Sequence, residues 1–172
     1  MRVSSLIVGR TGLALGAAIC AALLAFAYYL QYVKGLQPCP LCMVQRLFFY
    51  AMLFFFVVGA LHGRWVKLWS GLVVLSAVGG AAAASRHVWL QSLPPDKVPQ
   101  CGPDLFFMLE NFPFSRTFEK LLYGSGECAA VDWTFLGLSI AGWTLAWFVA
   151  LGLYALWLAF ARPRSAAAAA SP

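Results

Sequence analysis

Cys39 and Cys42 are separated by two residues and open an apolar stretch of the chain. Thiols at this spacing can cycle between a dithiol and a disulfide. Pro40 disfavours helical geometry at Cys39, whereas Cys42 falls near the first turn of the predicted helix, where unpaired N–H groups and the helix dipole favour a thiolate. The spacing therefore predicts a redox-active pair with Cys42 as the stabilised thiolate. An ordinary structural disulfide is the competing interpretation.

Arg46 lies four residues after Cys42 and therefore falls on the same face of the predicted helix. Its guanidinium can stabilise a thiolate or an anionic oxygen of a bound acceptor. The alternative is an arginine that only extends to the membrane surface. Its neighbour Gln45 is polar at the start of an apolar helix, where it faces either a cofactor or the lipid headgroups.

Three further cysteines are Cys20, Cys101 and Cys128. Cys20 falls within an apolar run, and we expect a buried small residue without chemistry there. Structural zinc sites usually take two closely spaced cysteine pairs, whereas Cys101 and Cys128 are far apart and no histidine is placed in the sequence to complete a compact site. We therefore expect no metal.

The composition is that of an integral membrane protein. Hydrophobic residues make up 62% of the 172 residues and charged residues only 10%, whereas soluble proteins carry about a quarter charged residues. The net charge of +6 comes from scattered basic residues that bracket apolar segments. These are topology signals rather than a nucleic-acid-binding patch.

Four apolar stretches are long enough to span a bilayer, which takes roughly 20 helical residues. The predicted fold is all-α, a bundle of four transmembrane helices forming a single domain over residues 1–164, followed by a disordered Ala-rich tail over 165–172. The predicted spans are 11–33, 43–61, 68–87 and 138–160.

Basic residues without acidic neighbours mark one side of the membrane, and all six acidic residues fall on the other. The positive-inside rule therefore predicts that both termini are cytoplasmic and that the loops over 34–42 and 88–137 face outside. Disulfides persist outside the inner membrane. The basic residues on the inner side are Arg2, Arg10, Arg64, Lys67, Arg162 and Arg164.

The amino-terminal region also resembles a cleavable signal peptide, with Arg2 and Arg10 before an apolar run that contains Ala25-Phe26-Ala27. The apolar run continues through several aromatic residues to Tyr32, too far past that site for a signal peptide. We expect the segment to remain as a spanning helix.

The second outer loop contains a helical pattern between its two cysteines. Phe114, Phe118, Leu121 and Leu122 recur at positions i, i+4, i+7 and i+8. This periodicity predicts an amphipathic helix that lies on the membrane surface or packs on the outer end of the bundle. Gly124-Ser125-Gly126 then gives Cys128 a flexible tether that could bring it to another cysteine pair.

Taken together, these motifs resemble the disulfide bond formation protein B (DsbB) family of bacterial inner-membrane thiol:quinone oxidoreductases. The resemblance covers nearly the whole chain and includes the four spans. Its motifs are Cys39-Pro-Leu-Cys42 with Gln45-Arg46, Cys101-Gly-Pro-Asp, Gly126-Glu-Cys128 and the stretch Asp132–Leu138. It implies that the outer loops face the periplasm, that the acceptor is a membrane quinone (ubiquinone or menaquinone), and that the partner is a DsbA-like protein of thioredoxin fold.

The resemblance also implies a route for the electrons. The reduced partner attacks Cys101, Cys128 then attacks Cys39, and the freed Cys42 thiolate donates to a quinone held near Arg46. His87 matches a family histidine near the quinone, although a histidine at this depth is also common as an interfacial residue. For Trp133 we expect an interfacial anchor.

Two other classes of protein share some of these features. A four-span scaffold of the tetraspanin kind would use its disulfides only to hold loops, and it gives no reason for Arg46 to follow the cysteine pair. Enzymes of the vitamin K epoxide reductase type place the Cys-x-x-Cys pair late in the chain, after the loop cysteines. The order here is the reverse.

Overall fold

The computed structural model describes residues 2–94, 126–131 and 133–160. The predicted amphipathic helix and Cys101 lie outside these residues, as does the tail over 165–172. The helices and strands within them are α1 (Arg2–Tyr32), α2 (Pro40–His62), α3 (Val66–Gln91), the 3-10 helix η2 (Gly126–Ala129), β1 (Thr134–Phe135), β2 (Leu138–Ser139) and α6 (Ile140–Phe160).

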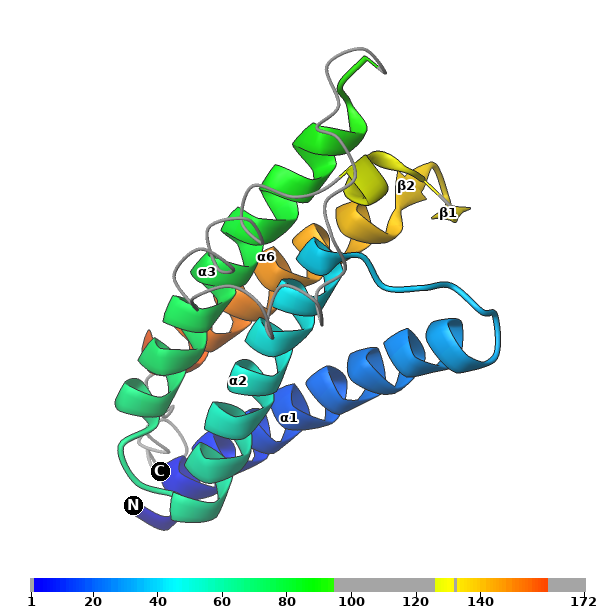
Figure 1. Ribbon diagram of the computed structural model, residues 1–172. Coiled ribbons are helices and arrows are strands. Elements are labelled where there is room, and N and C mark those ends of the chain that lie inside the picture. The colour runs from blue at the N-terminus through cyan, green and yellow to red at the C-terminus, as the bar shows by residue number, and fades with distance from the viewer. Residues whose placement is uncertain (1, 95–125, 132, 161–172) are drawn as a thin grey trace, which may run out of the picture.

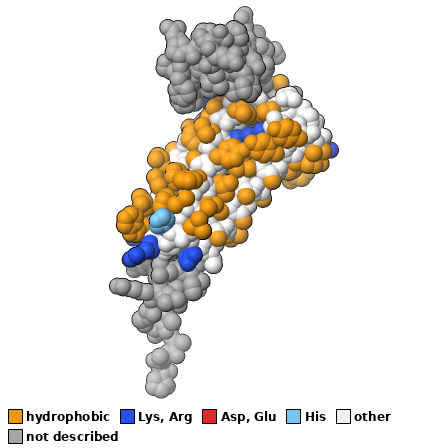
Figure 2. Space-filling view, turned by 60° about the horizontal axis from the view of Figure 1, so that its bottom comes forward, with side chains coloured by type: hydrophobic (Ala, Val, Ile, Leu, Met, Phe, Trp, Pro, Cys, Tyr) orange, Lys and Arg blue, Asp and Glu red, His pale blue; other side chains and the backbone are white. Residues whose placement is uncertain are grey.

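The four long helices confirm the all-α, four-span architecture. Each contains a segment of 21 to 26 residues that is long and apolar enough to cross a membrane. Large apolar side chains such as Leu75 and Leu153 point outward, 70% and 62% exposed, and Figure 2 shows hydrophobic side chains along the length of one face. Such a surface is stable in lipid rather than in water, so the chain is a multi-pass membrane protein.

The start of α2 is set by Cys39 and Pro40. Pro40 occupies the first helical position, where its missing N–H costs nothing and its fixed φ suits the helix. Cys39 is the N-cap, with an extended backbone (φ −68°, ψ 164°), and its sulfur accepts a hydrogen bond from the Cys42 N–H at 3.3 Å. Both cysteines therefore belong to the first turn of α2. At the other end, Gly63 adopts a left-handed conformation (φ 61°) that caps the helix.

The core of the bundle lies where α3 packs along both α2 and α6 (Figure 1). The rings of Phe49 and Phe148 stack with centroids 4.2 Å apart. Gly80 on α3 lets the Phe148 ring lie directly against the helix backbone, as small residues commonly do between membrane helices. Cys20 is fully buried in this core, which confirms the expected packing role.

Gly80→Ala is expected to destabilise the bundle. An added Cβ would overlap the Phe148 ring, so the ring or the helix must shift, at a cost of about 1–3 kcal/mol. Gly71→Ala is the matched control, because its Cβ meets nothing within 4 Å. Thermal unfolding in detergent should show a lower midpoint for Gly80→Ala only. Equal midpoints for the two variants would contradict this description of the core.

At the end of the bundle where α2 begins, α3 ends and α6 begins, the chain forms a small covering layer (Figure 1). β1 and β2 pair as an antiparallel hairpin, and η2 packs against α3 and α2. This layer places parts of the segment between α3 and α6 beside the cysteine pair.

Candidate active site

The two cysteines at the start of α2 lie in direct contact. The Sγ atoms of Cys39 and Cys42 are 2.9 Å apart, with the Cys39 thiol donating to the Cys42 sulfur. Both side chains are partly buried. A dithiol with adjacent sulfurs can close to a disulfide without rearrangement of the helix, as the spacing predicts.

Cys39 also faces a cysteine from the segment between α3 and α6. Cys128 on η2 is fully buried and forms a small cluster with Leu41 and Leu90, against which Cys39 packs. Hydrogen bonding to Cys128 and then to Cys42, together with burial, raises the pKa of the Cys39 thiol. These contacts favour the thiol form of Cys39 over its thiolate, and its neighbour Cys128 belongs to a segment remote in sequence.

Two buried polar side chains, Gln45 and His87, and the half-buried Thr144 meet beside the sulfurs from three helices. His87 on α3 lies with Nε2 3.7 Å from the Cys39 Sγ, and its Nδ1 is 3.0 Å from the Gln45 Nε2. The Gln45 Oε1 accepts a hydrogen bond from the Thr144 hydroxyl at 2.6 Å. Gln45 and His87 are only 2% and 3% exposed. The bond between the Gln45 amide and Nδ1 orients the imidazole so that Nε2 faces the Cys39 sulfur.

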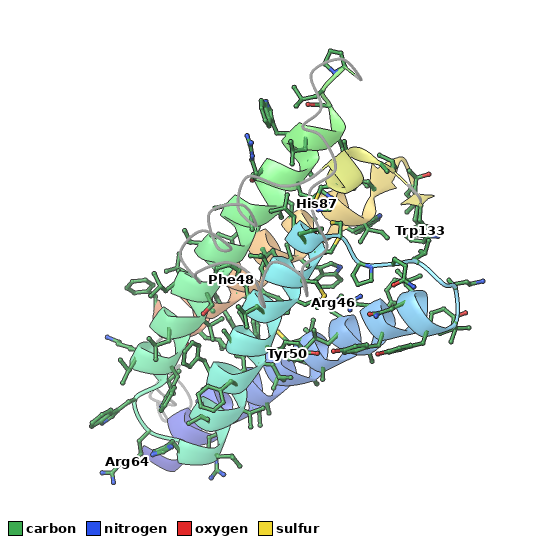
Figure 3. The ribbon with its side chains drawn as sticks, in the orientation of Figure 1. Arg46, Phe48, Tyr50, Arg64, His87 and Trp133 are labelled. Atoms are coloured by element: carbon green, nitrogen blue, oxygen red, sulfur yellow. The ribbon has the colours of Figure 1, made fainter. Side chains whose placement is uncertain are left out.

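Arg46 is held across the gap between α2 and α1. Its guanidinium donates to the Gln31 side-chain oxygen at 2.5 Å and to the Ala27 carbonyl at 3.2 Å. It also lies 5.1 Å from the centre of the Tyr28 ring. These partners are neutral, so they orient the cation without cancelling its charge. Figure 3 shows Arg46 between the two helices, far from Arg64 at the opposite end of α2.

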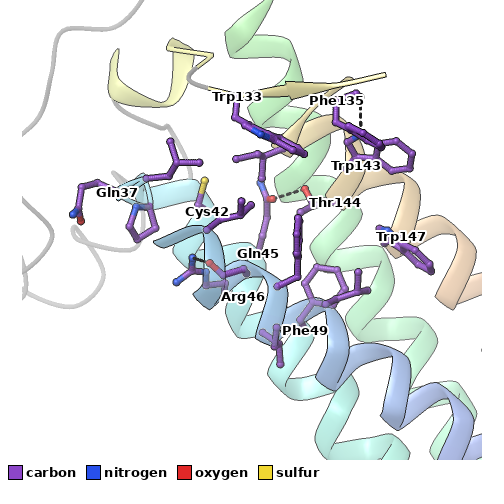
Figure 4. A pocket seen from close by; sticks show the side chains of 18 residues that line it. Gln37, Cys42, Gln45, Arg46, Phe49, Trp133, Phe135, Trp143, Thr144 and Trp147 are labelled. Atoms are coloured by element: carbon purple, nitrogen blue, oxygen red, sulfur yellow. Dashed lines mark hydrogen bonds between the residues drawn. The ribbon is translucent and has the colours of Figure 1, made fainter. Parts of the chain in front are cut away.

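A cavity of about 310 Å³ opens beside Cys42, between α1, α2 and α6 (Figure 4). Its walls are mostly aliphatic and aromatic, and its polar lining side chains include Gln37, Cys42, Gln45, Arg46 and Thr144. The apolar and aromatic lining residues include Leu24, Leu30, Phe49, Trp133, Trp143 and Trp147.

A second cavity of about 280 Å³ adjoins the first, with Cys42 and Trp133 among the residues that line both, and Cys39 and His87 line it as well. Cys42 therefore borders both cavities, whereas Cys39 borders only the smaller one. The two cysteines thus have different surroundings. Cys39 packs against the cluster that contains Cys128, and Cys42 borders the apolar cavity that Arg46 also lines.

This fold and site define a multi-pass membrane protein with a redox-capable cysteine pair placed between a loop cysteine and an apolar cavity. The family model for disulfide bond formation protein DsbB matches residues 9–158. The chain belongs to the DsbB family.

Similar proteins carry the name disulfide bond formation protein B. The protein of Hahella chejuensis is 55% identical over 152 residues, which cover 84% of this chain and 89% of the relative. That of Azoarcus sp. is 47% identical over 148 residues, covering 84% and 89%. That of Chromobacterium violaceum is 44% identical over 161 residues, covering 92% and 97%.

The structure brings five of the predicted site residues together: Cys39, Cys42, Gln45, Arg46 and His87. Cys128 joins them, and Cys101 lies outside the described residues. Trp133 lies on the wall of the larger cavity (Figure 4), and its role as an interfacial anchor stays a prediction.

Sequence reasoning missed the residues that hold Gln45 and Arg46 in place. These are Thr144 for Gln45, and Gln31 and Tyr28 for Arg46. Polar residues inside an apolar span are costly unless they have a partner. Gln31 and Thr144 both carry that signal, but the sequence alone does not give their partners.

Proposed function

We propose that the protein reoxidises a periplasmic dithiol protein of thioredoxin fold, DsbA-like, and passes the electrons to a membrane quinone. It would thereby sustain disulfide formation in periplasmic proteins. The observation that carries this proposal is that the two cysteines of the pair have different surroundings. Cys39 contacts Cys128, whereas Cys42 opens onto the apolar cavity beside Arg46.

The cavity fits the head group of a quinone, which is a flat apolar ring with two carbonyl oxygens. Aromatic and aliphatic side chains would contact the ring faces, and the Arg46 guanidinium is a charge-assisted donor for an oxygen. When bound, a quinone supplies a two-electron, two-proton acceptor. The chain's own part is to exclude water, orient the ring and hold a thiolate at Cys42.

His87 and Gln45 support the thiolate from behind. Nε2 of His87 faces the Cys39 sulfur, and Gln45 orients the ring through its bond to Nδ1. A donor aimed at a sulfur stabilises its anionic form. We assign His87 and Gln45 positioning roles at Cys42, with Gln45 also on the cavity wall.

On the donor side, we propose that a thiolate of the reduced partner attacks Cys101 of a Cys101–Cys128 disulfide, which forms a mixed disulfide with Cys101 and releases Cys128 as a thiolate. The partner's second thiol displaces Cys101 from the mixed disulfide, so that the partner leaves as a disulfide. Cys128 then attacks Cys39, which breaks the Cys39–Cys42 disulfide and releases Cys42 as a thiolate. The burial of Cys128 against Cys39 supports this order. This contact gives Cys128 direct access to Cys39 and leaves Cys42 available to the acceptor.

We place the dithiol at the periplasmic end of an inner-membrane protein with both termini in the cytoplasm. The basic side chains Arg10, Arg64 and Lys67 belong to the end of the bundle remote from Cys39, and Figure 2 shows a group of Lys and Arg side chains at one end, with further ones near the other. The positive-inside rule assigns that end to the cytoplasm. The cysteines then lie where disulfides persist.

Thr144→Val is expected to slow turnover about 5-fold, since a neutral hydrogen bond contributes about 1 kcal/mol. The substitution keeps the shape of the side chain but leaves the Gln45 oxygen without its 2.6 Å donor. Thr134→Val, in the exposed strand β1, is the matched control. Steady-state rates of quinone reduction measure the effect, and a wild-type rate in Thr144→Val would remove the positioning role of this bond.

The proposed activity is tested by mixing the purified protein anaerobically with a reduced thioredoxin-fold donor and a quinone. One quinone should be reduced for each donor disulfide that is formed. Each molecule of the protein should complete many such turnovers. Quinone loss without donor oxidation, or no loss with a well-folded protein, would contradict the proposal. The latter result would favour a scaffold whose cysteines only hold loops.

A further inference from the structure

The sulfurs of Cys39 and Cys42 and a ring nitrogen of His87 form a compact set of metal-ligating atoms. All three atoms lie within 4.8 Å of one another. His87 comes from α3 and the cysteines from the start of α2, so spacing along the chain does not place this histidine beside the pair. One of the two sequence-based grounds for excluding zinc, the lack of a suitably placed histidine, therefore fails.

We propose that the reduced protein binds a thiophilic divalent cation, zinc in the first instance, through Cys39, Cys42 and His87, and that the oxidised protein does not. Cysteine thiolates and imidazole nitrogen are the ligands that zinc prefers. The Cys39–Cys42 disulfide removes both thiolates at once. Metal binding is thus restricted to one redox state.

The distances suit a tetrahedral ion with small side-chain adjustments. Zn–S bonds of about 2.3 Å and Zn–N bonds of about 2.0–2.1 Å imply S···N separations of about 3.6 Å and S···S separations of about 3.8 Å. The Cys39 Sγ to His87 Nε2 distance is already 3.7 Å. The two sulfurs, now 2.9 Å apart, need to separate by roughly 0.9 Å, which rotation about the cysteine Cα–Cβ bonds allows.

The surroundings of His87 already contain the support that a metal-bound imidazole needs. A ligating histidine usually donates its other ring N–H to a nearby oxygen. Turning the Gln45 carboxamide presents its oxygen to Nδ1–H and its NH₂ to the Thr144 hydroxyl. Thr144 can accept that bond and donate to the Ala141 carbonyl at 2.9 Å.

Charge and access also favour the site. Two thiolates, a neutral imidazole and a dication sum to zero, which lowers the cost of burying charge near the bilayer. The cavity of about 280 Å³ that all three residues line leaves room for a water molecule as fourth ligand. Three protein ligands with an open fourth position are a common arrangement for zinc.

Such binding would inhibit the enzyme reversibly, because the metal would occupy both sulfurs of the reduced pair, which is the state that must transfer electrons to the acceptor. This consequence rests on the proposed quinone reductase function, whereas the binding itself does not. The two are therefore separable by measuring metal binding in the absence of quinone and donor.

The test uses the full-length protein in detergent, reduced and freed of reductant under anaerobic conditions, with cobalt(II) as a spectroscopic probe and zinc as competitor. We expect one cobalt per chain with the visible absorption of a tetrahedral thiolate site, displaced by zinc. Oxidised protein should show no such band. Affinity should fall at least about 10-fold in His87→Ala, since loss of even an outer-shell partner costs about 10–100-fold.

His62→Ala is the matched control, because His62 is the only other histidine of the chain and lies in the last turn of α2; it should bind as wild type does. Cys42→Ser provides a second, near-isosteric loss of a ligand. A Cys101→Ser/Cys128→Ser double variant should keep the site. No tetrahedral band in reduced wild type, equal affinity in His87→Ala and wild type, or loss of the band in the double variant would each overturn the proposal.

Discussion

Cys42→Ser is expected to reduce quinone turnover to the uncatalysed rate. A serine hydroxyl can neither form the disulfide with Cys39 nor donate electrons as a thiolate, and Cys42 is the cysteine that opens onto the apolar cavity. Anaerobic quinone reduction with a reduced thioredoxin-fold donor measures this directly. The variant should keep its fold, because the substitution changes one atom in a partly buried side chain.

Cys20→Ser is the control for this experiment. Cys20 is fully buried in the bundle core, away from both cavities, and a hydroxyl in a helix can bond the carbonyl one turn back. Its turnover should stay near that of wild type. Residual quinone turnover in Cys42→Ser well above the Cys-free background would show that another cysteine is the electron exit.

Arg46→Ala is expected to lower kcat/KM for the quinone by about 10- to 100-fold. This range corresponds to the about 1.5–3 kcal/mol contributed by a hydrogen bond to a charged group. Exchange with the protein partner should be largely unaffected, because Arg46 faces α1 and the larger cavity rather than Cys39. Single-turnover oxidation of the donor without quinone measures that exchange separately.

Arg86→Ala is the matched control. Arg86 lies on α3 with its guanidinium 4.3 Å from the centre of the Trp89 ring, and it lines neither cavity. Like Arg46→Ala, the substitution Arg86→Ala removes an arginine side chain near this end of the bundle. If Arg46→Ala slowed donor oxidation and quinone reduction equally, or if Arg86→Ala had the same effect, the role of Arg46 at the acceptor would be wrong.

The architecture follows from features that act locally along the chain. The apolar length of each span and the position of Pro40 are properties of short segments, and they predict four helices with the cysteine pair at the start of the second. Helix α2 begins at Pro40 rather than at residue 43, because a proline in the first helical turn and a capping residue before it extend the helix towards its N-terminus.

The site was predictable only as far as its residues share one helix. Cys39, Cys42, Gln45 and Arg46 lie within two turns of α2, and helical spacing alone places Cys42 and Arg46 on one face. The contacts of His87 with Cys39 and Gln45 join α3 to α2. Those contacts depend on how the helices pack, which no local pattern specifies.

The same distinction between local pattern and helix packing explains why the partners of Thr144 and Gln31 could not be predicted. Each is a polar residue in a span, which is a sign of a partner within the protein. Thr144 bonds to Gln45 across 99 positions, and Gln31 bonds to Arg46 across 15. Burial of these groups is tolerable because each finds a partner on another helix. The sequence shows the need for such partners and not their identity.

The central claim, a quinone site in the cavity beside Cys42, is tested most directly by photolabelling. A quinone with a photoreactive group on its ring would be bound to the full-length protein, irradiated, and located by peptide mass spectrometry. We expect labels on the cavity-lining parts of α1, α2 and α6, lost on addition of excess unmodified quinone. Labels confined to the lipid-facing surface of α3, or labels that excess quinone does not suppress, would contradict the account.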